Sequence, residues 1–486
     1  MKDSSRKAQA SGSKTEYIIV VFYFLLYLTA ALSLVLKQPF GNPPDEYNRY
    51  LIPQYIARHG TLPNGYDEAI RIGGYGFSYA FQPILPYMIQ GYCMRLISLF
   101  QPSDAALLLT ARLVNLLFGL VMALFVLLLS RQWFRDKRLQ YLFCFLVTLM
   151  PQSIFVHTYV NTDSCCMMSI AIMLYGLTLG IKEHFSYRSC ILLSIGIIFC
   201  ALSYYNAYGF ILSSILLFTA YFIKARPTPA SSAKGGSAYV VEWQSLLKKG
   251  GFISLLVLAG ISWWFIRSAL LYDGDILGLT ARDKCAALYA LPQFHPDTRI
   301  TWESQGFSIW EMLVQSDFIS LSTLSFIGIY GPMTIVTSIW IYRFYKLFFI
   351  SGLLLSVLWP ASFRTAGGKK AALSGEKHHR PVYRAFVHAN MIFCILMPIL
   401  LSIYYSYSTD YQPQGRYLLP MLIPFCYYCT RGFEKLFLSF CAKKPVRSSK
   451  ILTGLSFILI LLIILSLFVT IFGYAYPYYE ANPIAP

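Results

Sequence analysis

The sequence predicts an all-α polytopic membrane protein, and three features of its composition support this. Of the 486 residues, 56% are hydrophobic and only 13% are charged. Apolar runs of about 20 residues, each long enough to cross the hydrocarbon core as a helix, recur along the whole chain. Most of the basic residues behind the net charge of +18 lie in short segments between these runs, as in cytoplasmic loops. We therefore expect membrane lipids, and no nucleic acid, as partners.

About eleven of these runs are predicted to be membrane-spanning helices. They lie near residues 17–36, 107–130, 140–156, 165–181, 189–204, 206–223, 251–270, 333–359, 386–407, 417–433 and 451–473. A further run, Ile84–Phe100, contains Arg95, and every later loop changes sides if this run also crosses the membrane.

Loop charge decides between the two topologies. With Ile84–Phe100 lying along the outer interface, the cytoplasmic segments contain 27 Lys and Arg residues and 7 acids, against 10 and 15 in the external segments. Cytoplasmic loops normally carry the excess of Lys and Arg. We therefore expect a multi-pass protein of the plasma (inner) membrane, with its N-terminus in the cytoplasm and its C-terminus outside.

The predicted spans divide the chain into three parts. These are a cytoplasmic N-terminal tail, a large membrane module, and a last helix with a short external tail, at residues 1–16, 17–433 and 434–486. Two external loops of the module, 38–106 and 268–331, are too long to be simple connections, and loops of such length usually carry function. The cytoplasmic stretches Ala225–Trp243 and Ala361–Arg384 are rich in small and basic residues, so we expect flexible connectors there.

The first external loop begins with two adjacent acids, in the run Gly41-Asn42-Pro43-Pro44-Asp45-Glu46. Carboxylates beside a bilayer are costly to keep, which favours a functional role for Asp45 and Glu46. Asp45 also suits the N-cap of a helix that Gly60 would end, whose apolar residues at positions 47, 50, 51, 55 and 56 share one face. Because the helix dipole favours the ionised carboxylate, we expect a base or an ion-paired anion, with a plain N-cap as the alternative.

Other polar side chains are predicted to lie near these acids on the external side. A short turn between the third and fourth spans carries an amide and an acid, and arginines lie near the external ends of the second, seventh and tenth spans. Several arginines beside a carboxylate pair can bind a phosphate next to a general base, whereas their alternative role is to anchor helices at the interface. The candidate binding residues are Asn161, Asp163, Arg112, Arg267, Arg416 and Tyr417.

In their order along the chain, these segments resemble the GT-C superfamily of membrane glycosyltransferases, which use polyprenyl-phosphate sugars. Within it, the likeness is to bacterial membrane proteins marked by a Pro-Pro-Asp-Glu motif after the first span, which are similar to protein mannosyltransferases and aminoarabinose transferases. The matching segments are Pro43–Glu46, Gly60–Pro63, Ala111–Leu113 with Asn115, Asn161–Asp163, Trp264–Arg267, Tyr272–Asp275, Ser325–Gly328 and Gly415–Pro420. Departures from the family pattern are Asn48 and Arg49 in place of a His, Gln82–Pro86 in place of a Pro-Pro-Leu motif, and Tyr204–Asn206 in place of a Lys.

The resemblance implies a GT-C-like fold with interfacial helices in the first external loop. It also implies that a sugar moves from a lipid-phosphate donor to an extracytoplasmic glycan, lipid or protein acceptor, with inversion. Asp45 would take the proton of the acceptor hydroxyl, Glu46 or Asp163 would orient Asp45, and the arginines would stabilise the leaving phosphate. No cofactor is assigned; Glu46 and Asp163 could alternatively hold the acceptor or bind a divalent cation (Mg²⁺ or Mn²⁺), although no ligand spacing demands one.

Three other functions remain as alternatives. A lipid-linked sugar transporter or flippase is typically built from internal repeats with charges at the bilayer midplane, and we find no convincing repeat. A glycan polymerase or ligase would also use lipid-linked donors but would join oligosaccharides, and the third alternative is a non-catalytic relative that only binds a lipid phosphate. Uptake without product formation would favour the transporter.

Overall fold

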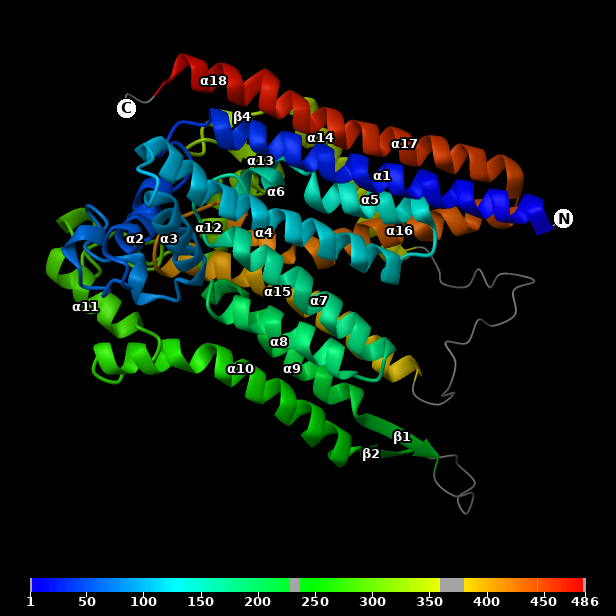
Figure 1. Cartoon of the computed structure of the whole chain (residues 1–486), viewed down its shortest axis with the longest axis horizontal. Coiled ribbons are helices and arrows are strands. Elements are labelled where there is room, and N and C mark those ends of the chain that lie inside the picture. Colours follow the sequence, from blue (N-terminus) through cyan, green and yellow to red (C-terminus); the bar gives the residue numbers. More distant parts are fainter. Residues whose placement is uncertain (1, 228–236, 359–379, 444, 484–486) are drawn as a thin grey trace.

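The computed structural model describes residues 2–227, 237–358, 380–443 and 445–483. It is a long bundle of helices, with the N- and C-termini at opposite ends (Figure 1). Seven helices among the described residues have the length and the apolar composition to cross a membrane. They are α1 (Lys2–Lys37), α4 (Asp104–Trp133), α7 (Asp163–Lys182), α10 (Trp243–Leu271), α14 (Ile339–Leu358), α15 (Arg380–Ser408) and α17 (Pro445–Phe468).

The other four predicted spans also fall on helices of the bundle. They are α8 (Tyr187–Ala201), α9 (Tyr208–Tyr221), α16 (Leu422–Lys443), and a span broken into α5 (Lys137–Thr148) and α6 (Pro151–Val156). The break follows from Pro151, which has no backbone N–H to continue a helix but suits the first position of a new one. The prediction of an all-α polytopic membrane protein is confirmed.

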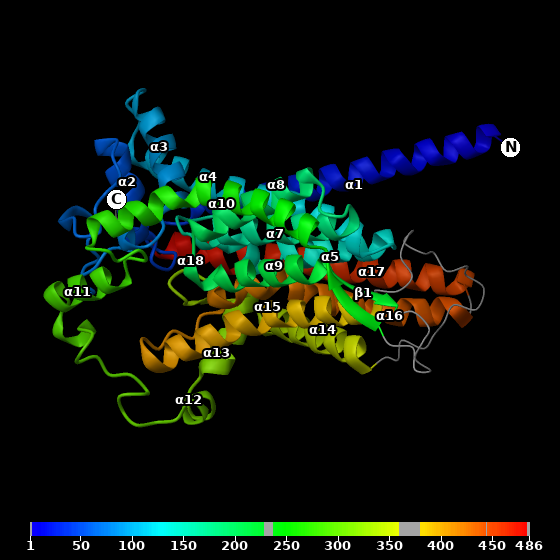
Figure 2. The same ribbon diagram turned by 90° about the horizontal axis from the view of Figure 1, so that it is seen from below.

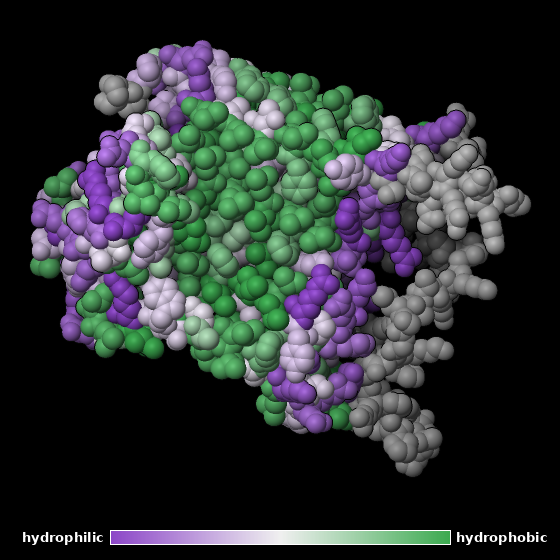
Figure 3. All heavy atoms as spheres, in the orientation of Figure 1, coloured by the Kyte–Doolittle hydropathy of each residue, from purple (hydrophilic) through white to green (hydrophobic). Residues whose placement is uncertain are grey.

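The surface of the bundle separates into an apolar belt and two polar ends. Figure 3 shows hydrophobic residues across the middle of the molecule and hydrophilic residues gathered at both ends of its long axis. Leu258 on α10 and Ile458 on α17 are more than half exposed. Such exposed apolar side chains are expected where helices face hydrocarbon rather than water.

One polar end is built from the two long loops that we predicted to be external. It holds α2 (Glu46–His59), α3 (Leu85–Ser98), α11 (Leu279–Tyr289) and α12 (Ile309–Gln315), which lie at one end of the bundle in Figures 1 and 2. α3 covers most of the segment Ile84–Phe100, and its 14 residues make a helix of about 21 Å. It packs along α2, the neighbouring helix of the same loop, and the interfacial placement of this segment stays a prediction.

α7 lies in the interior of the bundle and brings an acid to the polar end. Nearly all its side chains are buried, and it packs against α4 and α8. The contact with α8 is close, because a Cβ on Gly176 would lie 2.8 Å from the Leu193 nitrogen. Small residues at such crossings let membrane helices approach each other. This packing places Asp163, the first residue of α7, at the same polar end as α2.

Short elements connect the helices at both ends of the bundle. α13 (Phe318–Gly328) leads into the antiparallel pair β3 (Ile329–Tyr330) and β4 (Ile335–Val336), so α14 starts later than the predicted span. At the opposite end, β1 (Ile223–Pro227) and β2 (Ser237–Val241) form a hairpin where we predicted a flexible connector. The rest of that connector, residues 228–236, and residues 361–379 of the second one lie outside the described residues.

The first and last long helices both contact the bundle. α1 continues as a helix through residues 2–16 of the predicted tail, and α17 packs against α5 and α16. A π-helical turn, η6 (Val469–Ala475), then leads to α18 (Tyr476–Ala481), where Glu480 pairs with Lys37. The remaining short helices are η1 (Glu68–Ile70), η2 (Tyr79–Phe81), η3 (Tyr205–Ala207), η4 (Pro292–Phe294) and η5 (Gly415–Met421).

Candidate active site

A cavity of about 280 Å³ lies at the polar end that holds α2 and α11. Its wall comes from α2, both long loops, the segment before α9, the end of α15 and the start of η5, so residues far apart in sequence meet there. The wall is polar and aromatic. Its charged residues and tyrosines are Asp45, Asp410, Arg49, Arg282, Arg299, Tyr75, Tyr79, Tyr87, Tyr204, Tyr205, Tyr405 and Tyr417.

Asp45 is at the N-cap position of α2, but its side chain does not cap the helix, so the plain N-cap alternative is wrong. The backbone of Asp45 is left-handed, with φ of 62°. This conformation is strained for a residue other than glycine, and such strain is often found at functional sites. Asp45 Oδ2 accepts a hydrogen bond from Arg416 Nη2 at 2.5 Å, and Arg49 Nη2 lies 3.7 Å from the same oxygen. Within the described residues, Oδ1 takes part in no hydrogen bond or ion pair, and the side chain is 34% exposed to the cavity.

The two arginines determine the charge state of Asp45. Burial acts to raise the pKa of this carboxyl, but the charges of Arg416 and Arg49 and the hydrogen bond from Arg416 outweigh it. They hold the pKa of Asp45 below its ordinary value of 3.8. The carboxylate is therefore ionised at neutral pH, and its Oδ2 is paired with the two arginines.

Arg416 is placed by a close contact between η5 and α13. The Gly415 nitrogen donates to Ser325 Oγ at 2.6 Å, and a Cβ on Gly415 would lie 2.0 Å from the Phe326 nitrogen. Only glycine fits so close a backbone approach. The buried Arg416 side chain then extends from η5 to Asp45.

The second acid of the pair, Glu46, is fully buried. Arg112 binds both of its oxygens, with Nε 2.8 Å from Oε1 and Nη2 2.7 Å from Oε2, and the nitrogens of Gly41 and Val160 also donate to it. Arg112 donates further to main-chain oxygens, those of Val35, Gln38 and Pro39. These contacts occupy all five N–H groups of the guanidinium. Arg112 therefore has no donor left for a phosphate, and Glu46 has no oxygen facing the cavity.

In the turn before α7, Asn161 and Asp163 have different surroundings. Asn161 is buried inside the turn, where Nδ2 donates to two of its carbonyls and Oδ1 accepts from the Ser164 nitrogen at 2.9 Å. Asp163 is also nearly buried, and its Oδ2 lies 3.8 Å from Arg49 Nη1. Asp163 is thus linked to Asp45 through one shared guanidinium, whereas Asn161 shapes the turn.

The last two predicted residues differ in their access to the cavity. Arg267, near the end of α10, is not part of the wall: its Nη2 donates to the Pro63 carbonyl at 2.8 Å, and its guanidinium lies 5.3 Å from the Trp264 ring centre. Tyr417 does line the cavity, and its hydroxyl accepts a hydrogen bond from Arg416 at 3.1 Å.

Three arginines of the cavity wall were not among the predicted site residues. Arg49 follows Asp45 by four residues, and this helical spacing is the signal that would have paired them. Arg282 and Arg299 come from the second long loop; Arg282 donates to Asp283, and the Arg299 side chain has no hydrogen bond or ion pair within the described residues. No local pattern marks these two, because their place depends on how the two loops pack together.

The packing of the two long loops is tight beside the cavity. The Leu291 nitrogen donates to the Gly74 oxygen at 2.9 Å, and the Tyr75 and Phe294 rings stack with centroids 4.5 Å apart. Tyr75 and Arg299 both line the cavity. The contact therefore joins the segment that carries Arg299 to the loop that starts with Asp45.

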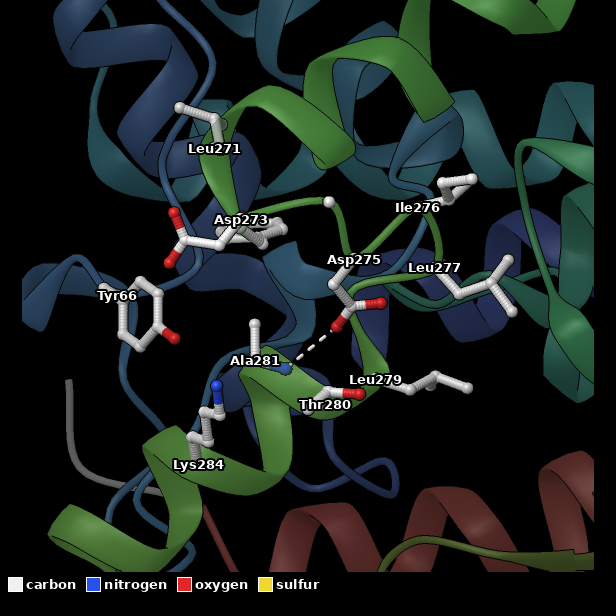
Figure 4. A pocket seen from close by; sticks show the side chains of 12 residues that line it. Tyr66, Leu271, Asp273, Asp275, Ile276, Leu277, Leu279, Thr280, Ala281 and Lys284 are labelled. Carbon is white, nitrogen blue, oxygen red and sulfur yellow. Dashed lines mark hydrogen bonds between the residues drawn. The ribbon is translucent and has the colours of Figure 1, made fainter.

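A wider hollow of about 710 Å³ lies at the same end, where α10 gives way to α11 (Figure 4). It contains the matching segment Tyr272–Asp275 but none of the predicted site residues. The Asp275 carboxylate accepts hydrogen bonds from the Gly278 and Ala281 nitrogens. Asp275 thus holds the start of α11, and the cavity beside Asp45 is the better candidate for chemistry.

Among the described residues, no group of three or more His, Cys, Asp and Glu side chains is placed to hold a metal ion. Asp45 and Asp163 each lie within 4 Å of the Arg49 guanidinium, which already supplies positive charge to both.

No protein-family model and no curated protein matches the sequence. Among solved structures, the oligosaccharyltransferase AglB from Archaeoglobus fulgidus, in complex with an inhibitory peptide and a dolichol-phosphate, aligns over 92% of this chain and 55% of its own, with 14% identity and a TM-score of 0.46. ArnT from Cupriavidus metallidurans, bound to undecaprenyl phosphate, aligns over 86% of this chain and 77% of its own, with 14% identity and a TM-score of 0.39. The chain spans about half the length of AglB. Similarity at this level does not identify an activity or a substrate for this chain.

Proposed function

We propose that the protein is a GT-C-type membrane glycosyltransferase that moves a sugar from a polyprenyl-phosphate donor to an extracytoplasmic glycan, lipid or protein acceptor. The observation that carries the proposal is the Asp45 carboxylate, ionised by two arginines and presenting one free oxygen to a cavity rich in arginine and tyrosine. The order of the motifs along the chain supports the same class.

In the proposed reaction, Asp45 Oδ1 accepts the proton of the acceptor hydroxyl while that oxygen attacks the anomeric carbon. The new carbon–oxygen bond forms on the face opposite the phosphate, and the bond to the phosphate oxygen breaks, with its electron pair leaving on the phosphate. The configuration inverts. Phosphate is already a good leaving group, so a general base and positive charge suffice, and the base contributes about 10²–10⁴ in rate.

The phosphate is assigned to the arginines that the cavity exposes. Arg282 and Arg299 line the wall and come from the second long loop, and neither is committed to a buried acid. Arg416 lies beside Asp45, where its charge also acts on the reacting centre. Arg112 and Arg267 are left out of this assignment, because their donors are held by Glu46 and by main-chain oxygens outside the cavity.

The tyrosines of the wall are assigned to the sugar. Tyr75, Tyr79 and Tyr417 present aromatic rings beside Asp45 and the arginines. Flat aromatic faces bind the apolar faces of sugar rings, while the charged groups around them bind hydroxyls. By the charge rule for loops, this polar end lies outside the cytoplasm, where flipped lipid-linked sugars are available.

The test is release of the lipid product. The purified protein in liposomes is given polyprenyl-phosphate glucose, mannose, galactose or aminoarabinose together with an extract of cell-envelope acceptors, and free polyprenyl phosphate is measured by mass spectrometry. We expect release with one donor class, and a fall of about 10²–10⁴ in Asp45→Asn. Asp104→Asn, at an exposed external acid in the first turn of α4, is the matched control and should retain turnover.

Two outcomes would contradict the proposal. Full turnover in a folded Asp45→Asn variant would remove Asp45 as the base. Movement of labelled donor across the liposome membrane with no release of polyprenyl phosphate would indicate a lipid-linked sugar transporter instead.

A further inference from the structure

Arg49 is the most enclosed cation of the cavity wall. It lies one helical turn after Asp45 on α2 and is 5% exposed. Its Nη2 is 3.7 Å from Asp45 Oδ2, and its Nη1 is 3.8 Å from Asp163 Oδ2. The guanidinium therefore stands between two carboxylates that come from separate parts of the chain.

Neutral groups hold the guanidinium in this position. Nη1 donates to the Thr162 hydroxyl at 3.1 Å and to the Tyr87 hydroxyl at 3.3 Å, and Cζ lies 5.0 Å from the centre of the Tyr79 ring. These partners come from the turn before α7, from α3 and from the first long loop. Arg49 is thus a built part of the site rather than a mobile surface charge.

Asp163 depends on this cation. Its side chain is 4% exposed, and within the described residues its Oδ2 accepts no hydrogen bond. A buried carboxylate needs a countercharge, and among the described residues Arg49 is the cation within ion-pair distance of it. Two carboxylates around one positive centre are also the arrangement by which proteins hold Mg²⁺ or Mn²⁺.

We propose that Arg49 is the resident cation of the acid pair: it holds Asp45 and Asp163 where a divalent metal ion would otherwise bridge them, so that the protein works without a metal. Arg49 is then a positioning residue, which sets the orientation of Asp45 through a shared charge. The expected absence of metal binding does not depend on the proposed function, whereas the expected effect of Arg49 on turnover rests on the proposed glycosyltransferase function.

Mn²⁺ is the probe, because its free form is counted directly by electron paramagnetic resonance. We expect no stoichiometric Mn²⁺ binding to the wild-type protein in nanodiscs. Arg49→Ala vacates the position between the acids and should gain one Mn²⁺ per chain, which Arg49→Ala combined with Asp163→Asn should lose again. Arg49→Lys keeps a cation and should not bind Mn²⁺. Thermal unfolding and gel filtration verify that each variant is folded.

Turnover provides the second measurement. Wild-type turnover should be unchanged by EDTA, while Arg49→Ala should fall about 10²-fold through misplacement of Asp45 and be partly restored by added Mn²⁺. A purely structural role for Arg49 would not produce rescue by a metal.

The inference is overturned if the wild-type protein binds Mn²⁺ in a manner that Asp163→Asn abolishes, or if folded Arg49→Ala gains no Mn²⁺. EDTA inhibition of the wild-type enzyme that Mn²⁺ reverses would also overturn it. If no variant or wild-type sample shows turnover with any donor, the proposed function fails, and the resonance measurement still decides the role of Arg49.

Discussion

Two neighbouring acids, Asp45 and Glu46, have opposite surroundings. Asp45 faces the cavity with one oxygen free, while Glu46 is enclosed by Arg112 and two backbone nitrogens. Asp45 precedes α2 with a left-handed backbone, whereas Glu46 is the first residue of the helix, so their side chains leave the chain in different directions. We therefore infer that Asp45 acts on substrate and that Glu46 and Arg112 hold the loop that positions it.

The pKa of Asp45 predicts the pH dependence of turnover. Because its pKa is held below 3.8, the carboxylate stays ionised across the neutral range, and base catalysis should be lost only as the pH falls through that lowered value. Arg416→Gln removes the larger of the two stabilising charges, so the pKa should rise and the loss should begin at higher pH. The measurement is kcat/KM against pH in liposomes. Arg58→Gln, at an exposed arginine of α2, should match the wild-type profile; a profile for Arg416→Gln that also matches it would contradict the assignment.

Arg112→Gln should lower the free energy of unfolding and leave the affinity for polyprenyl phosphate unchanged. It leaves Glu46 buried with its charge uncompensated, which costs about 3–5 kcal/mol. Reversible unfolding in detergent and binding of polyprenyl phosphate are measured side by side. If Arg112 instead contacted the phosphate, this variant would keep its stability and lose affinity, and the Arg282→Gln variant would not.

At the scale of elements, α2 shows what could be predicted from sequence and what could not. Its start directly after Asp45 and its end at Gly60 followed from turn chemistry. Its place along the membrane surface stays a prediction. Its contacts inside the protein did not follow from the sequence: Tyr47, predicted on the apolar face toward the membrane surface, is 59% exposed, and Glu46 and Arg49 are buried in the protein. Their partners, Arg112 and Asp163, lie on α4 and α7, and sequence spacing within α2 carries no trace of pairs formed across such distances.

The close contact between η5 and α13 leads us to expect that a substitution at Gly415 disturbs the site through η5, the element that positions Arg416. Gly415→Ala drives a Cβ against the Phe326 backbone, which must shift η5 and, with it, Arg416. We expect a stability loss of about 1–3 kcal/mol from overpacking and a fall in turnover of about 10²-fold from the displaced arginine. Gly454→Ala on α17, where nothing lies within 4 Å of the new Cβ, is the control for both measurements. Equal turnover in the two variants would show that η5 does not position the site.

At the scale of the whole molecule, hydropathy and charge were sufficient to predict the bundle and its two polar ends. Each apolar run of the sequence became a helix, and the acids gathered with the candidate site at one end. The cavity was not predictable, because Arg282 and Arg299 reach it only through the packing of one long loop against another. The same packing explains why the ordered motifs identified Asp45 and Arg416 but not those two arginines.

The arrangement of the ends predicts which residues an external reagent reaches. The loop charges predict that α3 lies along the interface instead of crossing, so residues on either side of it should be on the same face of the membrane. Single cysteines at Tyr66 and Phe100, both exposed, should react with a membrane-impermeant maleimide on intact cells, in a background from which the eleven native cysteines have been replaced. A cysteine at Arg135, in the short loop after α4, should react only after permeabilisation. If α3 were a membrane span, the Tyr66 and Phe100 sites would label from opposite sides and Arg135 would label from outside, and the assignment of the cavity to the external face would be lost with it.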